Sequence, residues 1–303
     1  MSLGGLDQWV MIRGESLANP PLILLSGGPG LSETSLFRHF NSPLESKFTL
    51  VYWDQRGSGK SFDDRTPRAS MTVEQFILDL DDLVEAVQER TGKPQVAIFG
   101  HSWGSVLGVL YAARFPTKVA AYVGSGQIGD WPAGESTSYA YAVKEAERQQ
   151  NEKALRELRA IGPPPYDAKS LWTERTWLQR FEGRLSAKVL WQMGRIFLEG
   201  PENSLMDLPN LLRGFRSTLD MMWKDVSTLN LHELAPALQV PVFLFLGRQD
   251  HWVPSETSVA YLNALSAPSK TVVWFEQSGH EPFMDEPAKF NAAIVDLVRP
   301  TLD

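Results

Sequence analysis

Ser102 lies two positions after Gly100 and two positions before Gly104 in the segment VAIFGHSWGSVLG, which covers residues 96–108. An apolar run ends at Gly100 and small residues follow Gly104, a pattern typical of a strand, a tight turn and a helix. Serine at such a turn adopts a strained backbone, and only very small residues fit two positions before and after it. A serine hydroxyl attacks a carbonyl carbon efficiently only when a base removes its proton. The segment therefore predicts covalent catalysis by Ser102, provided that a base lies nearby.

An aspartate and a histidine further along the chain have the positions that such catalysis needs. Asp250 ends the apolar run PVFLFLGRQD, and His280 ends the run TVVWFEQSGH. In an open α/β sheet, loops that follow parallel strands gather at one edge, so both side chains are expected near Ser102. We predict that His280 takes the proton of Ser102 and that Asp250 orients the imidazole.

The attacked carbonyl oxygen becomes negative and needs hydrogen-bond donors. In hydrolases with this type of turn, one donor is the backbone N–H after the serine and another comes from a glycine-rich loop such as SGGPG at residues 26–30. The backbone amides of Gly28 and Trp103 are therefore predicted to form the oxyanion hole. The side chain of Trp103 is also predicted to form a wall of the substrate pocket.

Other residues of the same types are weaker candidates. Asp225 is the runner-up for the acid, but no strand precedes it, and His101 is expected to pack beside the nucleophile without a chemical role. Asp54 and Arg56 lie in the loop DQRGSGKS and are expected to brace it, because a tight glycine-containing turn needs internal hydrogen bonds.

Strands and helices alternate along the parts of the chain that carry these residues. The helix predicted from Val73 to Val87 has apolar residues at spacings of three and four, and the helix Trp103–Phe115 follows the serine. Helices are also predicted at 256–265 and 287–298. Strands are predicted at 10–13, 22–26, 48–53, 96–99, 119–124, 241–246 and 271–275. Such βαβ alternation predicts an α/β fold with a mostly parallel sheet.

Strand patterns disappear between about residues 126 and 232. A charged amphipathic helix is predicted near Glu135–Ala160, followed by the breaker IGPPPY and further helices. We therefore predict a core formed by residues 1–125 and 233–303, with an inserted helical cap or lid at 126–232. Most of the aromatic residues of the cap are expected to form its own core, with one or two facing the cleft. These are Trp131, Trp172, Trp177, Phe181, Trp191, Phe197, Phe215 and Trp223.

Composition excludes several other classes of function. The chain has 303 residues, a net charge of −7 and no long basic run, so binding of nucleic acid has no electrostatic support. It has no cysteine, no metal-ligand spacing among its five histidines and no apolar run long enough to span a membrane. A cytoplasmic enzyme without metal or cofactor, acting on a small molecule or short peptide, is the expectation.

Three segments, LSGGPG, VYWDQRGSGKS and GHSWGS, together match a known pattern. They resemble HGGPG, W-D-Q-R-G-x-G-x-S and G-G-S-W-G-S of the proline iminopeptidase branch of the α/β-hydrolase fold. GRQD and SGH fall where this family has its acid and histidine. The resemblance implies a mostly parallel sheet with helices on both faces and a helical cap. Two positions depart from it: Ser26 replaces the usual histidine, and His101 replaces the glycine before the nucleophile.

The resemblance also implies a substrate class. Members that release N-terminal proline hold the substrate ammonium with carboxylates of the cap, and Glu199 and Glu202 are the candidates for this role here. A serine hydrolase of this type is therefore expected. A carboxylesterase or lactonase of the same fold is an alternative, because the triad itself accepts either leaving group. A hydrolase-fold protein that binds a ligand without turnover is a further one.

Overall fold

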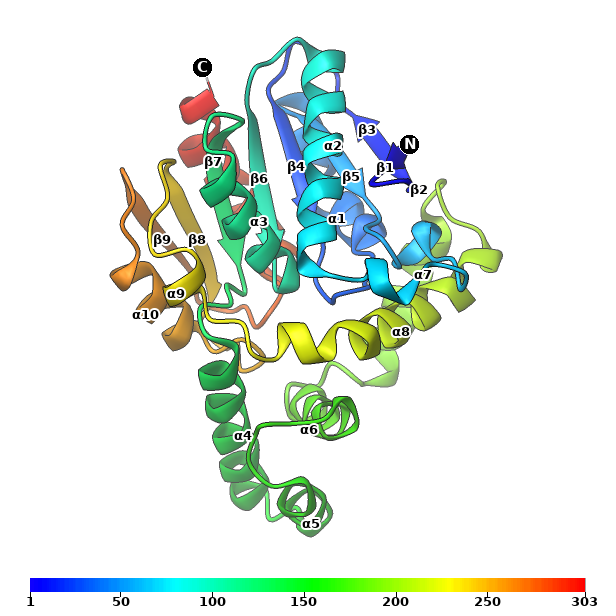
Figure 1. Cartoon of the computed structure of the whole chain (residues 1–303). Coiled ribbons are helices and arrows are strands. Elements are labelled where there is room, and N and C mark those ends of the chain that lie inside the picture. Colours follow the sequence, from blue (N-terminus) through cyan, green and yellow to red (C-terminus); the bar gives the residue numbers. More distant parts are fainter. Residues whose placement is uncertain (303) are drawn as a thin grey trace.

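A seven-stranded sheet forms the centre of the molecule in the computed structural model, which describes residues 1–302 (Figure 1). The strand order is β3-β5-β4-β6-β7-β8-β9, and all neighbours are parallel except β3 and β5. The strands are β3 (Val10–Arg13), β4 (Pro21–Leu25), β5 (Thr49–Trp53), β6 (Val96–His101), β7 (Val119–Ser125), β8 (Val242–Gly247) and β9 (Lys270–Phe275). These are the strands predicted from the sequence, with bounds that differ by at most two residues.

The central strands are apolar throughout because both faces of the sheet are covered. In β4, Ile23 and Leu25 pack on one side of the sheet, and Leu22 and Leu24 pack on the other. Parallel pairing aligns β4 with β6, so the glycine-rich turn after β4 and the serine after β6 emerge side by side.

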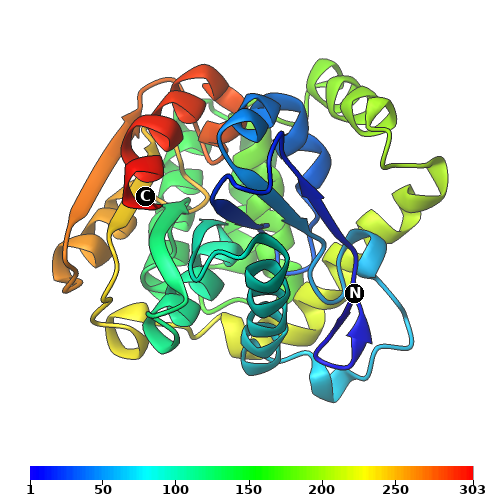
Figure 2. The same ribbon diagram turned by 90° about the horizontal axis from the view of Figure 1, so that it is seen from above.

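Helices cover both faces of the sheet, as Figure 2 shows from above. On one face lie α2 (Val73–Thr91), α3 (Trp103–Arg114) and α10 (Ser255–Ala264). On the other lie α1 (Thr34–Asn41), α11 (Pro282–Asp285) and α12 (Pro287–Ala293), which continues as one π-helical turn at Ile294–Val298. Short 3₁₀ turns occur at Ser42–Ser46, Gly59–Ser61, Arg68–Ser70, Leu205–Asp207 and Arg299–Leu302.

The segment between β7 and β8 is helical. Its helices are α4 (Trp131–Arg148), α5 (Glu152–Ile161), α6 (Ala168–Phe181), α7 (Ala187–Glu199), α8 (Leu208–Val226) and α9 (Leu231–Leu234). Figure 1 shows α4, α5, α6 and α8 below the edge of the sheet where the parallel strands end. Met222 and Val226 of α8 belong to the same apolar cluster as the sheet, so this cap is packed onto the core. The division of the chain at residues 125 and 232 stays a prediction.

The structure differs from the sequence prediction in several places. The single helix expected at 135–160 is two helices, because Gln150 has a φ of +52° and the side chain of Asn151 accepts the N–H of Ala154 to begin α5. Helix α1 was not predicted. Nor was the N-terminal hairpin of β1 (Ser2–Leu3) and β2 (Leu6–Asp7), which buries Leu3 against the core.

None of the helices in residues 1–302 is long and apolar enough to cross a lipid bilayer.

Candidate active site

Ser102 occupies the sharp turn between β6 and α3. Its φ of +52° and ψ of −118° lie in a region that favours glycine, so the surrounding backbone holds the residue in strain. A Cβ at Gly100 would collide with the backbone of Gly104, and a Cβ at Gly104 would collide with the carbonyl of Leu25 in β4. The two flanking glycines therefore allow the turn to form against the neighbouring strand, as the sequence predicted.

The hydroxyl of Ser102 makes no capping hydrogen bond to α3 and lies in the lining of a cavity. His280 lines the same cavity from the loop after β9. Ser102 and His280, 178 positions apart, are thus brought to one cavity at the C-terminal edge of the sheet.

Asp250 and His280 form a buried pair. The Nδ1 of His280 lies 2.9 Å from Oδ2 of Asp250, and the two residues are 3% and 4% exposed. The other oxygen, Oδ1, accepts the backbone N–H groups of Trp252 and Val253 at 3.0 and 2.9 Å. Because the carboxylate accepts at Nδ1, this nitrogen carries a proton and Nε2 is left as the basic nitrogen. The runner-up acid, Asp225, is exposed near the end of α8.

The hydrogen bonds of residues 1–302 do not include one between Ser102 Oγ and His280 Nε2. In ligand-free active sites this bond is often long or poorly aligned, and it tightens when substrate binds. A second feature keeps the imidazole in place: Gly126, after β7, has a φ of +53°, and a Cβ there would press against the ring of His280.

The predicted oxyanion donors lie beside Ser102. Gly28 lines the cavity and has a φ of +119°, which only glycine adopts easily. Trp103 is the first residue of α3, so its backbone N–H has no acceptor within the helix. Both amides are thus available to a ligand oxygen.

The side chain of Trp103 does not form the pocket wall that the sequence predicted. The side chain is completely buried between α3 and the sheet. Its ring packs edge-on against Phe76, and its indole N–H donates to Gln55 Oε1 at 3.0 Å. Its ring fills the core between α2 and α3 because the first turn of α3 runs along the sheet.

Asp54 and Arg56 brace the loop after β5, mainly through bonds to other segments rather than within the loop itself. Asp54 accepts the hydroxyls of Ser32 and Thr34 and the backbone N–H of Lys60. Arg56 forms a bidentate pair with Asp79, with both N–O distances at 2.8 Å. Neither residue lines the cavity with Ser102.

The two glutamates predicted to bind substrate lie elsewhere. Glu199 is exposed at the end of α7 and pairs with Arg195 at 2.7 Å, and Glu202 pairs with Arg38 of α1 at 2.7 Å. Neither belongs to the cavity lining, because α7 runs along α1 and away from Ser102. The structure therefore gives no geometric support for a substrate contact at these residues.

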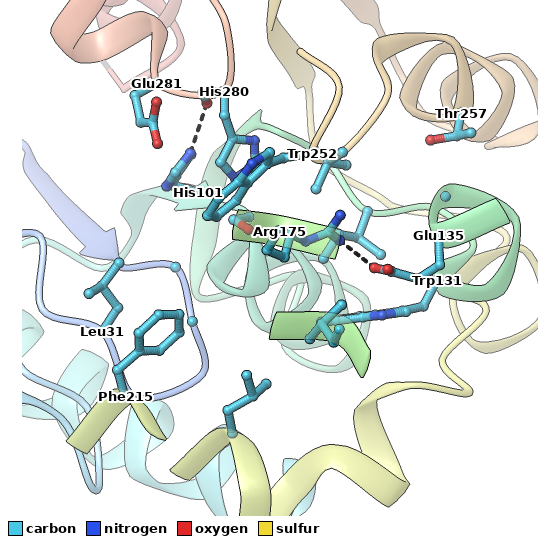
Figure 3. Close-up of a pocket in the computed structure, with 18 of the residues that line it drawn as sticks. Leu31, His101, Trp131, Glu135, Arg175, Phe215, Trp252, Thr257, His280 and Glu281 are labelled. Carbon is cyan, nitrogen blue, oxygen red and sulfur yellow. Dashed lines mark hydrogen bonds and ion pairs between the residues drawn. The ribbon is translucent and has the colours of Figure 1, made fainter. Parts of the chain in front are cut away.

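The cavity encloses about 830 Å³, including the part that is open to solvent, and has an apolar wall on one side. Of the eight cap aromatics, Trp131, Trp172 and Phe215 line the cavity. Trp172 packs edge-on against Phe215, with ring centroids 4.9 Å apart. Trp177 and Phe181 pack inside the cap instead, and Trp191 is 65% exposed. Trp252, which sequence reasoning missed, adds another aromatic ring between His280 and Arg175 (Figure 3).

The cavity lining also carries charged groups that sequence reasoning missed. The carboxylates of Glu33, Asp130, Glu135 and Glu281 line the cavity, whereas Arg175 is its only Lys or Arg among residues 1–302. Figure 3 shows Arg175 reaching from the cap toward Glu135. Since these residues come from separate loops and helices, no local pattern in the sequence links them.

Arg175 joins two buried carboxylates. Its Nη2 bonds to Glu135 Oε1, and its Nη1 bonds to Glu174 Oε2 at 2.9 Å. Burial raises the pKa of Glu174 to about 8 although Arg175 opposes this, and burial raises the pKa of Glu135 as well. Glu135 Oε2 and Glu174 Oε1 have no hydrogen-bond donor among the described residues. The indole N–H of Trp131 helps to lower the pKa of Glu135 but makes no hydrogen bond of good geometry.

His101 does more than pack. Its Nδ1 lies 2.7 Å from Glu33 Oε1, and its Nε2 lies 2.9 Å from the backbone oxygen of His280. The dashed line between His101 and His280 in Figure 3 marks the second of these bonds. In residues 1–302, no cluster of three or more His, Asp or Glu side chains has an arrangement that could hold a metal ion.

Comparisons with known proteins agree with the fold of this chain. A family model described as the alpha/beta hydrolase fold matches residues 20–163. The probable aminopeptidase YbaC of Bacillus subtilis (strain 168) is 33% identical over 299 residues, which cover 96% of this chain and 92% of that protein. A proline iminopeptidase of Heyndrickxia coagulans is 26% identical over 295 residues, which cover 94% of this chain and 92% of that protein.

A solved structure shows the same fold over the whole chain. An esterase, RhEst1, from Rhodococcus sp. ECU1013 has a TM-score of 0.67 and 18% identity, with 100% of this chain and 98% of that chain covered. The parallel sheet, the strained serine after β6 and the near full-length relative thus lead to one assignment. The chain belongs to the α/β-hydrolase family, on its proline iminopeptidase-like branch.

Proposed function

We propose that this protein is a serine hydrolase that releases an N-terminal residue, such as proline, from a short peptide or amide. The observation that carries the proposal is a cavity in which a strained serine and an aspartate-bound histidine lie next to an excess of carboxylates. The names of the two relatives that cover almost the whole chain, an aminopeptidase and a proline iminopeptidase, support the same reaction.

The mechanism begins with Ser102. His280 Nε2 takes the hydroxyl proton as Oγ bonds to the substrate carbonyl carbon, and Asp250 stabilises the imidazolium through Nδ1. The imidazolium then protonates the leaving amine as the carbon–nitrogen bond breaks, which leaves an ester on Ser102. A water molecule, deprotonated by His280, hydrolyses this ester and restores the hydroxyl.

The backbone N–H groups of Gly28 and Trp103 stabilise the oxyanion of both tetrahedral intermediates. In other serine hydrolases, removal of one such donor raises the barrier by about 2.7–4 kcal/mol, so these amides matter as much as the triad.

The substrate ammonium is assigned to Glu135. Its Oε2 lacks a hydrogen-bond donor and the residue lines the cavity, so a cationic N–H group would supply the missing partner. Arg175 holds the other oxygen and so fixes the direction of the carboxylate. Trp172, Phe215 and Leu219 line the apolar wall of the cavity, which suits a small apolar ring such as that of proline.

A first experiment tests covalent catalysis. A fluorophosphonate probe is expected to label the wild-type protein at Ser102 and to leave the S102A variant unlabelled, because only the serine hydroxyl is activated. The melting temperature of S102A should stay almost unchanged, since the hydroxyl makes no capping bond and alanine keeps the same Cβ. Failure of the folded wild type to react would favour a protein that binds its ligand without turnover.

A second experiment tests the ammonium site. The E135Q variant keeps an oxygen for Arg175 but loses the charge, so kcat/KM for a proline arylamide should fall about 10- to 100-fold. The activity on a p-nitrophenyl ester without an amino group should change much less. E199Q is the matched control, because Glu199 is exposed outside the cavity. Turnover of esters or lactones alone by the wild type would replace the aminopeptidase with the esterase or lactonase alternative.

A further inference from the structure

The two positions that depart from the family pattern meet in the structure at one residue, Glu33. The hydroxyl of Ser26 accepts the backbone N–H of Glu33 at 3.2 Å, and the Glu33 carboxylate bonds to His101 at 2.7 Å. Glu33 lies in the loop between β4 and α1, and His101 ends β6. Both residues are buried, with His101 only 2% exposed.

The hydrogen bonds of His101 require that both ring nitrogens carry a proton. Its Nδ1 faces a carboxylate and its Nε2 faces the carbonyl oxygen of His280, and both of these groups are acceptors. Burial alone would lower the pKa of His101, but the charge and the hydrogen bond of Glu33 outweigh it and raise the pKa to about 9. Glu281 and the His280 carbonyl act in the same direction.

The second oxygen of Glu33 extends this set of contacts to the glycine-rich turn after β4, which carries the proposed oxyanion donor Gly28 and is called the oxyanion turn below. Glu33 Oε2 accepts the backbone N–H of Gly27 at 3.0 Å, and Gly27 directly precedes the proposed donor Gly28. One continuous series of hydrogen bonds therefore runs from Gly27 through Glu33 and His101 to the backbone of His280. It joins the loops after β4 and β9 beneath the nucleophile.

We propose that the buried His101–Glu33 pair has a positioning role. It holds the backbone of His280, the proposed base, at a fixed place relative to the turn that carries the oxyanion donor Gly28. This inference rests on the proposed function. The imidazolium fixes the carbonyl of His280 while Asp250 fixes the ring, so the base is held at two points. Neither His101 nor Glu33 reacts with substrate in this scheme.

The protonation of this pair should also make the activity depend on alkaline pH. When His101 loses its proton above about pH 9, one of its ring nitrogens becomes an acceptor. The ring can then no longer donate hydrogen bonds to both the Glu33 carboxylate and the His280 carbonyl. The groups around it are Glu33, Glu281 and His280, and Arg184 of the cap pairs with Glu281 at 3.3 Å. The loop of His280 loosens when this bond is lost, and kcat falls.

Three variants separate positioning from simple packing. H101F keeps a ring of similar size but removes both hydrogen bonds, whereas H101Q restores one donor toward the His280 carbonyl. E33Q offers an amide donor to His101 Nδ1 and an oxygen to Gly27, so it preserves the contacts around a neutral His101. H39F is the control, because His39 is exposed on α1 and packs on Phe40.

The measurements are the labelling rate at Ser102, kcat and KM as functions of pH, and crystal structures of the variants. In H101F, labelling and kcat are expected to fall about 10- to 100-fold with KM changed less than about threefold, and H101Q should recover part of the loss. Wild-type kcat should decline above about pH 9, and this decline should disappear in E33Q, whatever the level of its activity near pH 7.5.

Several results would overturn the proposal. One is an H101F variant that labels as fast as H39F; another is the same alkaline decline in wild type and E33Q. A crystal structure of H101F in which residues 278–281 keep their position would also overturn it, whatever the activity. An unlabelled wild type contradicts the proposed function instead, and the crystal structures still decide on the positioning role.

Discussion

At the residue scale, the residues of the proposed triad differ in how they are held. Ser102 is placed by its backbone alone, through a strained φ that its two flanking glycines permit. His280 is placed by side-chain bonds from Asp250 and His101, and by close contact with Gly126. The serine is thus specified by local sequence, whereas the histidine depends on residues from three other segments of the chain.

A prediction at this scale concerns the choice of the acid. In D250N, the amide donates toward His280 Nδ1 and favours the wrong tautomer, so kcat should fall roughly 10⁴-fold with the fold retained. D225N is the matched control because Asp225 is exposed on α8, and its kcat should equal that of the wild type. Steady-state kinetics of both variants test this. Equal losses in the two variants would contradict the assignment of Asp250.

At the element scale, the site depends on how closely α3 approaches the sheet. The first turn of α3 passes the carbonyl of Leu25 so closely that a Cβ at Gly104 has no room. Strands β4 and β6 are held side by side, from Leu22–Ala97 to Leu25–Gly100, so a shift of α3 would also move Ser102 relative to the oxyanion turn.

A pair of glycine-to-alanine variants tests this close approach. G104A is expected to lower the free energy of unfolding by about 1–3 kcal/mol or more, because the methyl group must displace backbone atoms. G194A, within α7, meets no atom within 4 Å and should raise it by up to about 1 kcal/mol, because alanine favours the helix. Urea unfolding measures both. A stable G104A variant would show that α3 can move away without cost.

At the scale of the whole molecule, the cap and the core enclose a site with buried charges. Ion pairs connect the two parts: Arg184 with Asp285, Arg38 with Glu202, and Lys60 with Asp207. Buried acids such as Glu174 and Glu182, each with a pKa raised by burial to about 8, lie on the cap side. Their protonation links the stability of the folded chain to pH.

The sign of this linkage follows from proton binding. Between about pH 4.5 and 8 the folded state keeps a proton on Glu174 and the unfolded state does not, so the free energy of unfolding decreases as pH rises. The slope for one group is at most about 1.4 kcal/mol per pH unit. Loss of the His101 proton near pH 9 acts in the same direction.

E174Q removes one of these titrating groups, so the free energy of unfolding should decrease less steeply as pH rises. E199Q should follow the wild type, because Glu199 is exposed. Urea unfolding between pH 5 and 9 measures the effect. A slope that is the same in E174Q and wild type would mean that Glu174 is already ionised in the folded state at neutral pH.

The sequence by itself determined the parts of this protein that depend on neighbouring residues. The apolar runs that form the strands, the glycines around Ser102, and the positions of Asp250 and His280 after their strands are all local patterns. They predicted the fold, and they predicted which side chains would meet at the C-terminal edge of the sheet, because parallel strands end at the same edge.

Only the tertiary structure decided what surrounds these side chains. It turned Trp103 into the core, placed Glu199 and Glu202 outside the cavity, and brought Glu135 of α4 against Arg175 of α6. The Glu33–His101 contact likewise joins residues 68 positions apart. The physical reason is that helix packing sets the direction and burial of each charged side chain, and the local spacing of residues does not specify how the helices and loops pack against one another.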